Sequence, residues 1–383
     1  MSRSDPPPPG AAFQAKLHDD LDALDARHRR RALAPRVGRD FASNDYLGLA
    51  ASPEMRDIVA AALARGVPVG AGGSRLLRGN HDEHEALETE AAAWFGSEAA
   101  LYFSTGFAAN GGIFAALPGA DDLVVHDELI HASAHDGMRL GRAARVSVAH
   151  NRADAVAAAI SAWRRDGAKG RAWIAVESLY SMDGDRAPIA DLMAIADRED
   201  AVLIVDEAHA TGVLGSDGRG LAAPWEGRDN LITLRTCGKA LGAEGALVCA
   251  SRGVCDVLIN RARGFIFSTA PSPLMAAAVR GSLALLDREP ERIARLDALV
   301  CHAQDRLGPL GALASGSPIM PVIIGDDARA MAIAAKLQAR GFDVRGIRPP
   351  TVPVGTARLR LSITLNVDEA TIDALAGALK EIL

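Results

Sequence analysis

The middle of the chain alternates short apolar runs with segments of helical periodicity, and this alternation constrains the fold more than any other feature. The apolar runs predict strands at residues 123–125, 173–176, 202–205, 231–234, 246–249 and 265–267. Helical periodicity favours helices at 84–94, 152–165 and 189–199. Strands that alternate with helices form a mostly parallel sheet covered on both faces, which binds ligands at the carboxyl ends of its strands.

Three reactive side chains follow two of these predicted strands. Asp206 and His209 lie in VDEAHAT after the run 202–205, and Lys239 lies in TCGKALG after the run 231–234. We therefore expect all three to face one crevice. An amine and a carboxylate suit pyridoxal phosphate (PLP), because the amine forms a Schiff base and the carboxylate keeps the pyridine nitrogen protonated. Taken singly, Lys239 is also compatible with a surface lysine and Asp206 with a helix N-cap.

The pattern changes after the Pro-Ser-Pro sequence at 271–273. Helices are expected at 274–286, 292–307, 328–340 and 369–379, with strands at 322–324 and 359–363. The predicted organisation is an N-terminal tail and helix (1–43), a large PLP-binding domain (44–270) and a smaller α+β domain (271–383) packed with the N-terminal segment. The proline-rich start, MSRSDPPPPG, predicts a disordered tail.

Composition excludes several classes of function. The 383 residues are 49% hydrophobic and 23% charged, the balance of a soluble globular protein. A net charge of −6 gives no overall attraction to nucleic acid or to an anionic membrane. No apolar run is long enough for a membrane span, and the N-terminus lacks the apolar core of a secretory signal. The four cysteines show no metal-ligand spacing. We expect a cytoplasmic enzyme without a metal, a nucleic-acid partner or a membrane partner.

Several ordered motifs between residues 44 and 364 resemble the α-oxoamine synthases, which are PLP enzymes of the aspartate-aminotransferase fold. The motifs are NDYLGL, GAGGSRLLRG, STGFAAN, HDELIHAS, SMDGDRAPI, VDEAHATGVLG, TCGKALGAEGA, FSTAPSP and IRPPTVPVGTARLRLSIT. The last motif resembles the oxononanoate-forming branch of the family. This resemblance implies fold type I, with a mostly parallel seven-stranded sheet and a homodimer. It also implies condensation of L-alanine with a pimeloyl thioester, carried by coenzyme A or by a carrier protein.

The resemblance assigns a role to each reactive residue. Lys239 is expected to carry the cofactor, Asp206 to pair with its pyridinium nitrogen, and His209 to bond its phenolic oxygen. His131 is expected to stack on the ring and to contact the substrate. His126 and His135 are interpreted as structural, and a metal is the alternative for this histidine cluster. Their spacing lacks an accompanying acid motif such as His-Glu-x-x-His.

Further cofactor contacts are expected at helix starts and hydroxyl groups. Gly106 and Phe107 open a predicted helix at 107–116, whose first amides can hold a phosphate. The family resemblance adds four hydroxyl residues around the cofactor: Ser181, Thr236, Ser268 and Thr269. The last two resemble the pair that reaches the phosphate of the neighbouring subunit. Turn and capping chemistry explain any single Ser or Thr equally well.

Substrate contacts are expected at both ends of the chain. Arg360 in ARLRLS shares one face of a strand with Arg358, and either guanidinium can fork onto an α-carboxylate. The resemblance favours Arg360. It also implies acyl-substrate contacts at Arg29 and Thr351, with Asn44 as a further candidate. The alternative for Arg29 is solvated surface, the usual state of a basic run such as HRRR.

Other functions remain as alternatives. A relative that uses glycine or another acyl thioester shares the same chemistry. A nicotinamide-dependent oxidoreductase requires a G-x-G-x-x-G turn after its first strand, and no such turn occurs. GAGGSRLLRG lacks the Lys-Ser/Thr ending of a phosphate loop, so its glycines are expected to pass close to the cofactor of a partner subunit. A catalytically inactive protein of this fold is a third alternative. The presence of Asp206, His209 and Lys239 together argues against it, because an inactive protein does not need all three.

Overall fold

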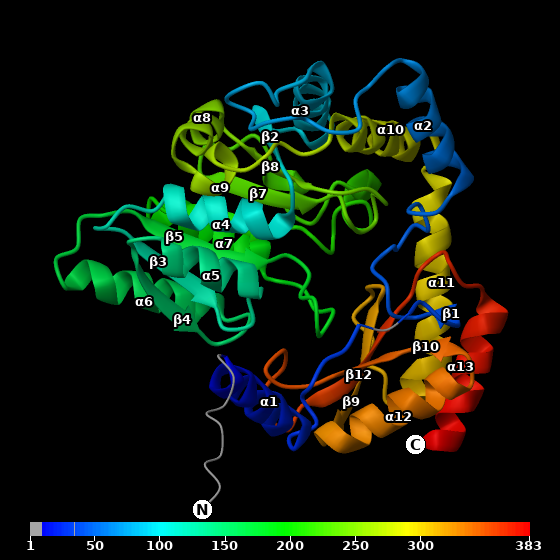
Figure 1. Cartoon of the computed structure of the whole chain (residues 1–383). Coiled ribbons are helices and arrows are strands. Elements are labelled where there is room, and N and C mark those ends of the chain that lie inside the picture. Colours follow the sequence, from blue (N-terminus) through cyan, green and yellow to red (C-terminus); the bar gives the residue numbers. More distant parts are fainter. Residues whose placement is uncertain (1–9, 34) are drawn as a thin grey trace, which may run out of the picture.

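The centre of the molecule is a seven-stranded sheet in which every neighbouring pair except those of β8 is parallel (Figure 1). The computed structural model describes residues 10–33 and 35–383. The predicted disordered tail therefore lies, except for Gly10, outside the described residues. In spatial order the strands are β2 (Ala99–Phe103), β8 (Ala246–Ala250), β7 (Leu231–Thr236), β6 (Val202–Asp206), β5 (Ala172–Glu177), β3 (Leu123–Asp127) and β4 (Ala144–Val148). The predicted mostly parallel, seven-stranded sheet is confirmed.

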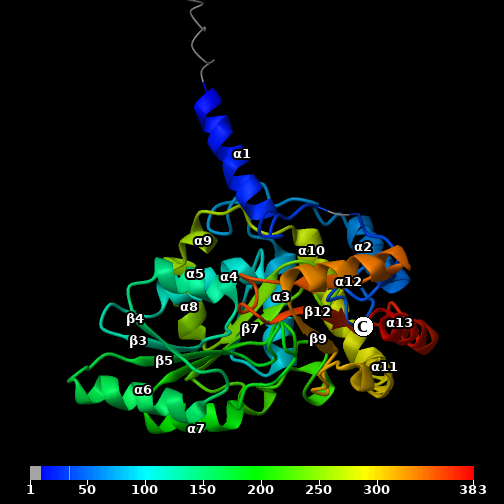
Figure 2. The ribbon, with the colours of Figure 1, turned by 90° about the horizontal axis from the view of Figure 1, so that it is seen from below.

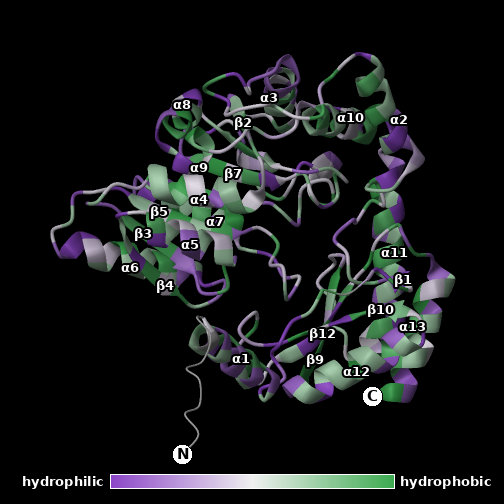
Figure 3. Ribbon diagram, viewed as in Figure 1, coloured by the Kyte–Doolittle hydropathy of each residue, from purple (hydrophilic) through white to green (hydrophobic). Residues whose placement is uncertain are grey.

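Helices cover both faces of this sheet, which explains why most of its strands are continuously apolar. One face packs against α4 (Gly106–Ala116), α5 (Ala132–Leu140), α8 (Arg252–Arg261) and α9 (Arg263–Ile266). The other packs against α6 (Ala153–Arg165), α7 (Ile189–Arg198) and α3 (Asp82–Phe95). Strands β3 and β5 are hydrophobic along most of their length (Figure 3). The exposed edge strand β4 is the exception.

A second, smaller unit follows α10 (Pro273–Arg288). Its antiparallel sheet has the order β11 (Arg345–Ile347), β12 (Ala357–Ser362) and β9 (Ile319–Gly325). The helices of this unit are α11 (Glu291–Leu307), α12 (Asp327–Ala339) and α13 (Glu369–Ile382). This agrees with the α+β pattern expected after residue 270.

The N-terminal segment joins both units. Strand β1 (Arg39–Asp40) pairs with β10 (Phe342–Asp343), and α2 (Pro53–Ala64) packs on α10. Helix α1 (Ala11–Asp25) projects from the body (Figure 2). Several of its apolar side chains are exposed. None of the helices in the described ranges is long and apolar enough to cross a membrane.

One predicted strand is wrong. Residues 265–267 do not extend the sheet, because α9 occupies Arg263–Ile266. Phe265 is buried against Phe103, with ring centroids 5.3 Å apart, whereas Phe267 is 71% exposed. A three-residue apolar run cannot distinguish a strand from a short helix, and here packing against α4 decided for the helix. The sequence pattern also missed the buried strand β2.

Candidate active site

The carboxyl ends of three neighbouring strands form the floor of the candidate site. Asp206 ends β6, Glu177 ends β5 directly beside it, and the loop after β7 carries Lys239. Above them lies a cavity of about 800 Å³. Seven of the predicted site residues line this cavity: Asn44, His131, Ser181, His209, Lys239, Thr351 and Arg360. The structure thus brings together side chains that are up to 316 residues apart in the chain.

A line of hydrogen bonds joins Lys239 to the N-terminal segment. Lys239 Nζ lies 2.7 Å from His209 Nε2, and His209 Nδ1 lies 2.6 Å from the Tyr46 hydroxyl. Burial lowers the pKa of Lys239 to about 8, and Asp206 and Glu177 limit that fall. Burial and the nearby Lys239 lower the pKa of His209 well below its usual value. A neutral His209 beside an easily deprotonated amine suits a lysine that acts as nucleophile and base.

Asp206 is fixed in place by two donors. Its Oδ2 accepts a hydrogen bond of 2.9 Å from Asn110 Nδ2, and its Oδ1 accepts one of 3.0 Å from the Ala208 amide. Asn110 comes from α4 and also donates to Ser133 Oγ at 2.9 Å. The Asp206 side chain therefore keeps one orientation at the floor of the site.

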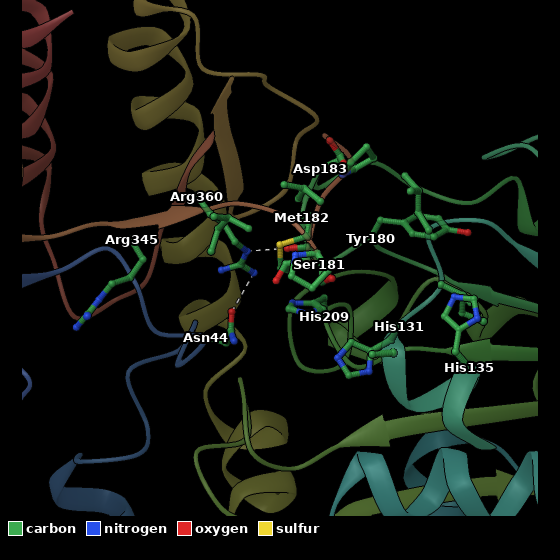
Figure 4. A pocket seen from close by; sticks show the side chains of 18 of the residues that line it. Asn44, His131, His135, Tyr180, Ser181, Met182, Asp183, His209, Arg345 and Arg360 are labelled. Atoms are coloured by element: carbon green, nitrogen blue, oxygen red, sulfur yellow. Dashed lines mark hydrogen bonds between the residues drawn. The ribbon is translucent and has the colours of Figure 1, made fainter. Parts of the chain in front are cut away.

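His131 caps the N-terminus of α5 and lines the cavity. Its Nδ1 lies 2.7 Å from Ser133 Oγ, and burial lowers its pKa. Figure 4 shows His131 and His209 near one another at the cavity. His135 also lines the cavity, and its ring makes an edge contact with the buried His126 at 5.0 Å. Within the described ranges, no three metal-ligating side chains gather as a metal site requires.

The predicted phosphate-holding residues lie beside the cavity lining. Helix α4 begins at Gly106, where Thr105 Oγ1 caps the Ala108 amide at 3.0 Å. A Cβ added to Gly106 would lie 3.9 Å from Thr236 Oγ1, so the helix start adjoins the end of β7. Phe107 is exposed, which leaves the first turn of α4 open to a ligand. Ser268 and Thr269 are exposed and do not line the cavity.

Arg360 forms the wall opposite the floor. Its Nε donates to the Ser181 carbonyl at 2.6 Å and its Nη2 to Asn44 Oδ1 at 3.0 Å (Figure 4). Arg358 points from the same strand toward the same loop, but its guanidinium is paired with Asp183. The geometry therefore favours Arg360 over Arg358 as the carboxylate-binding arginine, because Arg360 lines the cavity whereas Arg358 does not and is paired with Asp183.

Arg29 is not brought to the cavity. Its Nη2 forms an ion pair of 3.5 Å with Asp327 of α12. Arg31, two residues further on, lines the cavity and donates to Thr351 Oγ1 at 3.1 Å. Of the two, Arg31 is the arginine that lines the cavity.

Side chains that the sequence patterns did not single out complete the site. Tyr46 and Asn110 lie in the motifs NDYLGL and STGFAAN, but nothing in those motifs indicates that they bond His209 and Asp206. His150 lies between two carboxylates, 2.9 Å from Asp127 Oδ1 and 2.7 Å from Asp185 Oδ2. These contacts tie the end of β3, which leads to the His131 loop, to the SMDGD loop that carries Ser181.

The glycine-rich segment GAGGSRLLRG folds back on itself. A Cβ added to Gly79 would lie 2.0 Å from the Gly73 carbonyl oxygen, so only glycine fits there. Arg75 is enclosed and forms an ion pair of 2.8 Å with Glu88. Gly73 and Gly79 thus allow two stretches of this chain's backbone to lie close together. The expected approach of this segment to the cofactor of a partner subunit stays a prediction.

Comparison with known proteins identifies the family. The model of the class I and II aminotransferases matches residues 38–379. The chain belongs to this family. It is 43% identical to an 8-amino-7-oxononanoate synthase from Anaeromyxobacter dehalogenans over 95% of this chain and 94% of that protein. The enzyme of the same name from Methylobacterium radiotolerans is 44% identical over 94% of this chain and 95% of its own length. These relatives confirm the predicted resemblance.

Solved structures agree with the fold of this family member. A serine palmitoyltransferase from S. paucimobilis, solved with bound PLP and myriocin, superimposes with a TM-score of 0.86. It is 25% identical and is matched over 98% of both chains. An 8-amino-7-oxononanoate synthase from Francisella tularensis has a TM-score of 0.75 and 27% identity, over 90% of this chain and 97% of that one.

The donor set at the floor fits PLP. Lys239 supplies an amine whose pKa is lowered by burial, and Asp206 supplies a carboxylate that two donors hold still. The open first turn of α4 supplies backbone amides of the kind that bind a phosphate. His131 lies above this floor, at the cavity surface.

Proposed function

We propose that the chain condenses L-alanine with a pimeloyl thioester and releases carbon dioxide and free thiol. The product of this reaction is 8-amino-7-oxononanoate, an intermediate of biotin biosynthesis. The full-length similarity to synthases of that name carries the proposal. Lys239 and His209, which lie 2.7 Å apart at the cavity, support it, with Asp206 at the nearby end of β6.

The cofactor we assign to the site is PLP, which supplies an electron sink for the carbanion that forms at the amino acid's α-carbon. Asp206 is placed to accept a hydrogen bond from a protonated ring nitrogen, and His131 to cover the ring. Lys239 Nζ takes the α-proton of alanine and returns a proton once the carboxylate has left as carbon dioxide. Burial supports this role, since it lowers the pKa of Lys239 to about 8 and leaves a usable fraction of neutral amine.

The wall of the cavity selects and orients the substrates. Arg360 offers a planar guanidinium to the alanine carboxylate, with Asn44 beside it. Arg31 and Thr351 line the same cavity, and we assign the acyl substrate to them. The volume of about 800 Å³ falls in the range of sites that enclose small-molecule ligands. During condensation the α-carbon bonds to the thioester carbonyl carbon, and the carbon–sulfur bond breaks to release the thiol.

The test is an assay of the purified chain loaded with PLP. L-alanine, glycine and L-serine are each paired with pimeloyl-coenzyme A, with a pimeloyl carrier protein and with palmitoyl-coenzyme A. We expect thiol release and a product of the mass of 8-amino-7-oxononanoate only with alanine and a pimeloyl thioester. Lys239→Ala should abolish both signals, whereas Lys169→Ala, which changes an exposed lysine, should retain them.

Each alternative pattern of products contradicts a different part of the proposal. Turnover of glycine but not alanine keeps the cofactor and overturns the amino acid. Turnover of serine with palmitoyl-coenzyme A overturns both substrates. A protein that takes up no PLP, judged by the absence of a visible absorption band, overturns the proposal as a whole.

We propose further that the active unit is a homodimer. Ser268 and Thr269 are exposed and do not line this chain's own cavity, as residues that serve a neighbouring subunit would be. Apolar side chains on α1, with Phe13 62% exposed, and elsewhere on the surface, with Leu77 84% exposed, offer area for such contact.

Subunit mixing tests whether the two chains share a site. Lys239→Ala and the double variant Ser268→Ala/Thr269→Ala are first assayed alone and then after being refolded together. A shared site gives little activity in either variant and partial recovery in the mixture, because one of the two sites in a hybrid dimer is intact. Full activity of the double variant, or a monomer by light scattering, contradicts the shared site.

A further inference from the structure

Glu177 is a buried acid that the proposed reaction does not use. It is the last residue of β5, and its backbone stands in register with Asp206 on the neighbouring strand β6. Only 3% of its surface is exposed. Adjacent parallel strands are about 4.8 Å apart, so two carboxyl groups are held close together beneath the cavity.

The hydrogen bonds of Glu177 leave half of its carboxyl group unused. Oε2 accepts one bond of 3.2 Å from the Ser181 amide, and Oε1 has no partner among the described residues. Glu207, another fully buried glutamate, is different. It accepts bonds from Ser178 Oγ and from two backbone amides, and Arg235 faces it.

The groups that face Glu177 include two acids. Asp206 faces it from β6 and Asp127 from β3, while Lys239 approaches from the loop after β7. Burial and the charge of Asp206 raise the pKa of Glu177 to about 8, against the pull of Lys239 and the Ser181 amide. Two adjacent buried carboxyl groups rarely both ionise. The carboxyl group of Asp206 accepts two hydrogen bonds, whereas that of Glu177 accepts one. A single negative charge shared by the pair is therefore better stabilised on Asp206.

We propose that Glu177 is held as a neutral carboxylic acid beside an ionised Asp206, and that in this form it positions the Ser181 loop at the cofactor. Its carbonyl oxygen accepts from the Ser181 amide, and the carbonyl oxygen of Ser181 in turn accepts from Arg360. Glu177 is thus a positioning residue that links the floor of the site to its wall. The second half of this inference rests on the proposed use of PLP, whereas the protonation of Glu177 does not.

Infrared spectroscopy tests the protonation directly. At neutral pH the cofactor-free protein should show a carbonyl band of a protonated carboxylic acid that disappears in Glu177→Gln. The matched control is Glu244→Gln, which changes an exposed glutamate in the loop after Lys239 and should keep the band. The band should also vanish as pH rises through about 8. A spectrum in which Glu177→Gln removes no such band overturns the proposal.

Cofactor binding tests the positioning. Glutamine keeps the carbonyl acceptor and the neutral charge, so Glu177→Gln should bind PLP, followed by its visible absorption, with nearly unchanged affinity. Glu177→Ala loses the acceptor for the Ser181 amide and should bind PLP about tenfold more weakly. Rescue by glutamine but not by alanine identifies a neutral acceptor. If glutamine weakens binding as much as alanine does, an ionised Glu177 is needed, and the proposal fails.

The readouts separate this inference from the proposed function. A carboxylic acid band without any PLP binding contradicts the proposed function and the positioning role, while it leaves the neutral acid in place. Should Glu177→Ala not fold, the comparison of wild type with Glu177→Gln still decides both points.

Discussion

The floor and the wall of the cavity are built in different ways. The floor consists of strand ends and the loop after a strand, where Asp206, Glu177 and Lys239 are placed by the backbone register of one sheet. The wall consists of residues from segments near the two ends of the chain, which meet through side-chain hydrogen bonds. Arg360 donates to Asn44, and Arg31 donates to Thr351. A sheet fixes its strand ends rigidly, so the reacting groups belong on the floor. Segments that meet through side chains tolerate sequence changes, so residues that select a substrate can change there without disturbing the sheet.

The largest effect is expected at the floor from Lys239→Ala. Loss of the amine removes both the attachment of the cofactor and the base, so turnover should fall at least about 10⁴-fold. Thiol release in the presence of alanine and pimeloyl-coenzyme A measures it, with Lys169→Ala as control. Residual turnover within tenfold of the wild type would show that the floor is not where the chemistry takes place.

Asp206→Asn should cost less, about 10²- to 10³-fold in kcat, because a neutral amide no longer stabilises a protonated ring. The variant should still bind PLP, because Lys239 and the start of α4 remain. Steady-state kinetics and the visible spectrum separate the two effects. Asp200→Asn, which changes an exposed aspartate, should behave as the wild type. A loss of PLP binding without a loss in kcat would contradict this role.

A smaller effect is expected at the wall. Arg360→Lys loses the planar fork and should raise the KM for alanine about 10- to 100-fold, with a smaller change in kcat. Arg358→Lys is the matched control, because Arg358 lies on the same face but is paired with Asp183. The comparison between floor and wall breaks down if Arg360→Lys lowers kcat and leaves KM unchanged, or if Arg358→Lys raises KM equally.

The smallest effect is expected at His150, which bonds Asp127 at the end of β3 and Asp185 in the SMDGD loop, and it concerns the pH dependence of stability. Burial opposes the charge on His150, but its bonds to Asp127 and Asp185 outweigh burial and raise its pKa from 6.5 to about 10. The folded state therefore keeps a proton that the unfolded state loses, so this contribution to stability is complete below pH 6.5 and declines as pH rises toward 10. His150→Gln should flatten that decline in urea unfolding of the cofactor-free protein. An unchanged pH dependence in the variant would show that His150 carries no extra proton.

The sequence predicted the reacting groups better than the residues that hold them in place. Apolar runs placed Asp206 and Lys239 after two strands, and parallel pairing then brings such strand ends to one edge. The partners of these residues could not be predicted in the same way. Tyr46 bonds His209 across 163 residues and Asn110 bonds Asp206 across 96, and no local pattern records such distances.

The sequence was least informative where the chain has no long periodic pattern. Arg29 and Arg31 lie in an irregular segment, so a family resemblance could not say which of them reaches the cavity. The run 265–267 failed for a related reason, because three apolar residues fit either a strand or one helical turn. The alternation along β12, in contrast, correctly put Arg358 and Arg360 on one face, and an acidic neighbour then distinguished them.

Each of the three guanidinium nitrogens of Arg360 donates one hydrogen bond before any substrate arrives. The acceptors are the Ser181 carbonyl, the Ser362 hydroxyl and the Asn44 amide oxygen, all of them uncharged. A guanidinium has five N–H groups, so each Nη keeps one further donor. A substrate group that takes a two-pronged grip on Arg360 competes with the uncharged acceptors, and an ionised carboxylate gains most from that competition. This competition makes the protein selective for substrates that carry an ionised carboxylate. Amino amides and esters, which match alanine in size, should be turned away at the wall before they reach the reacting groups.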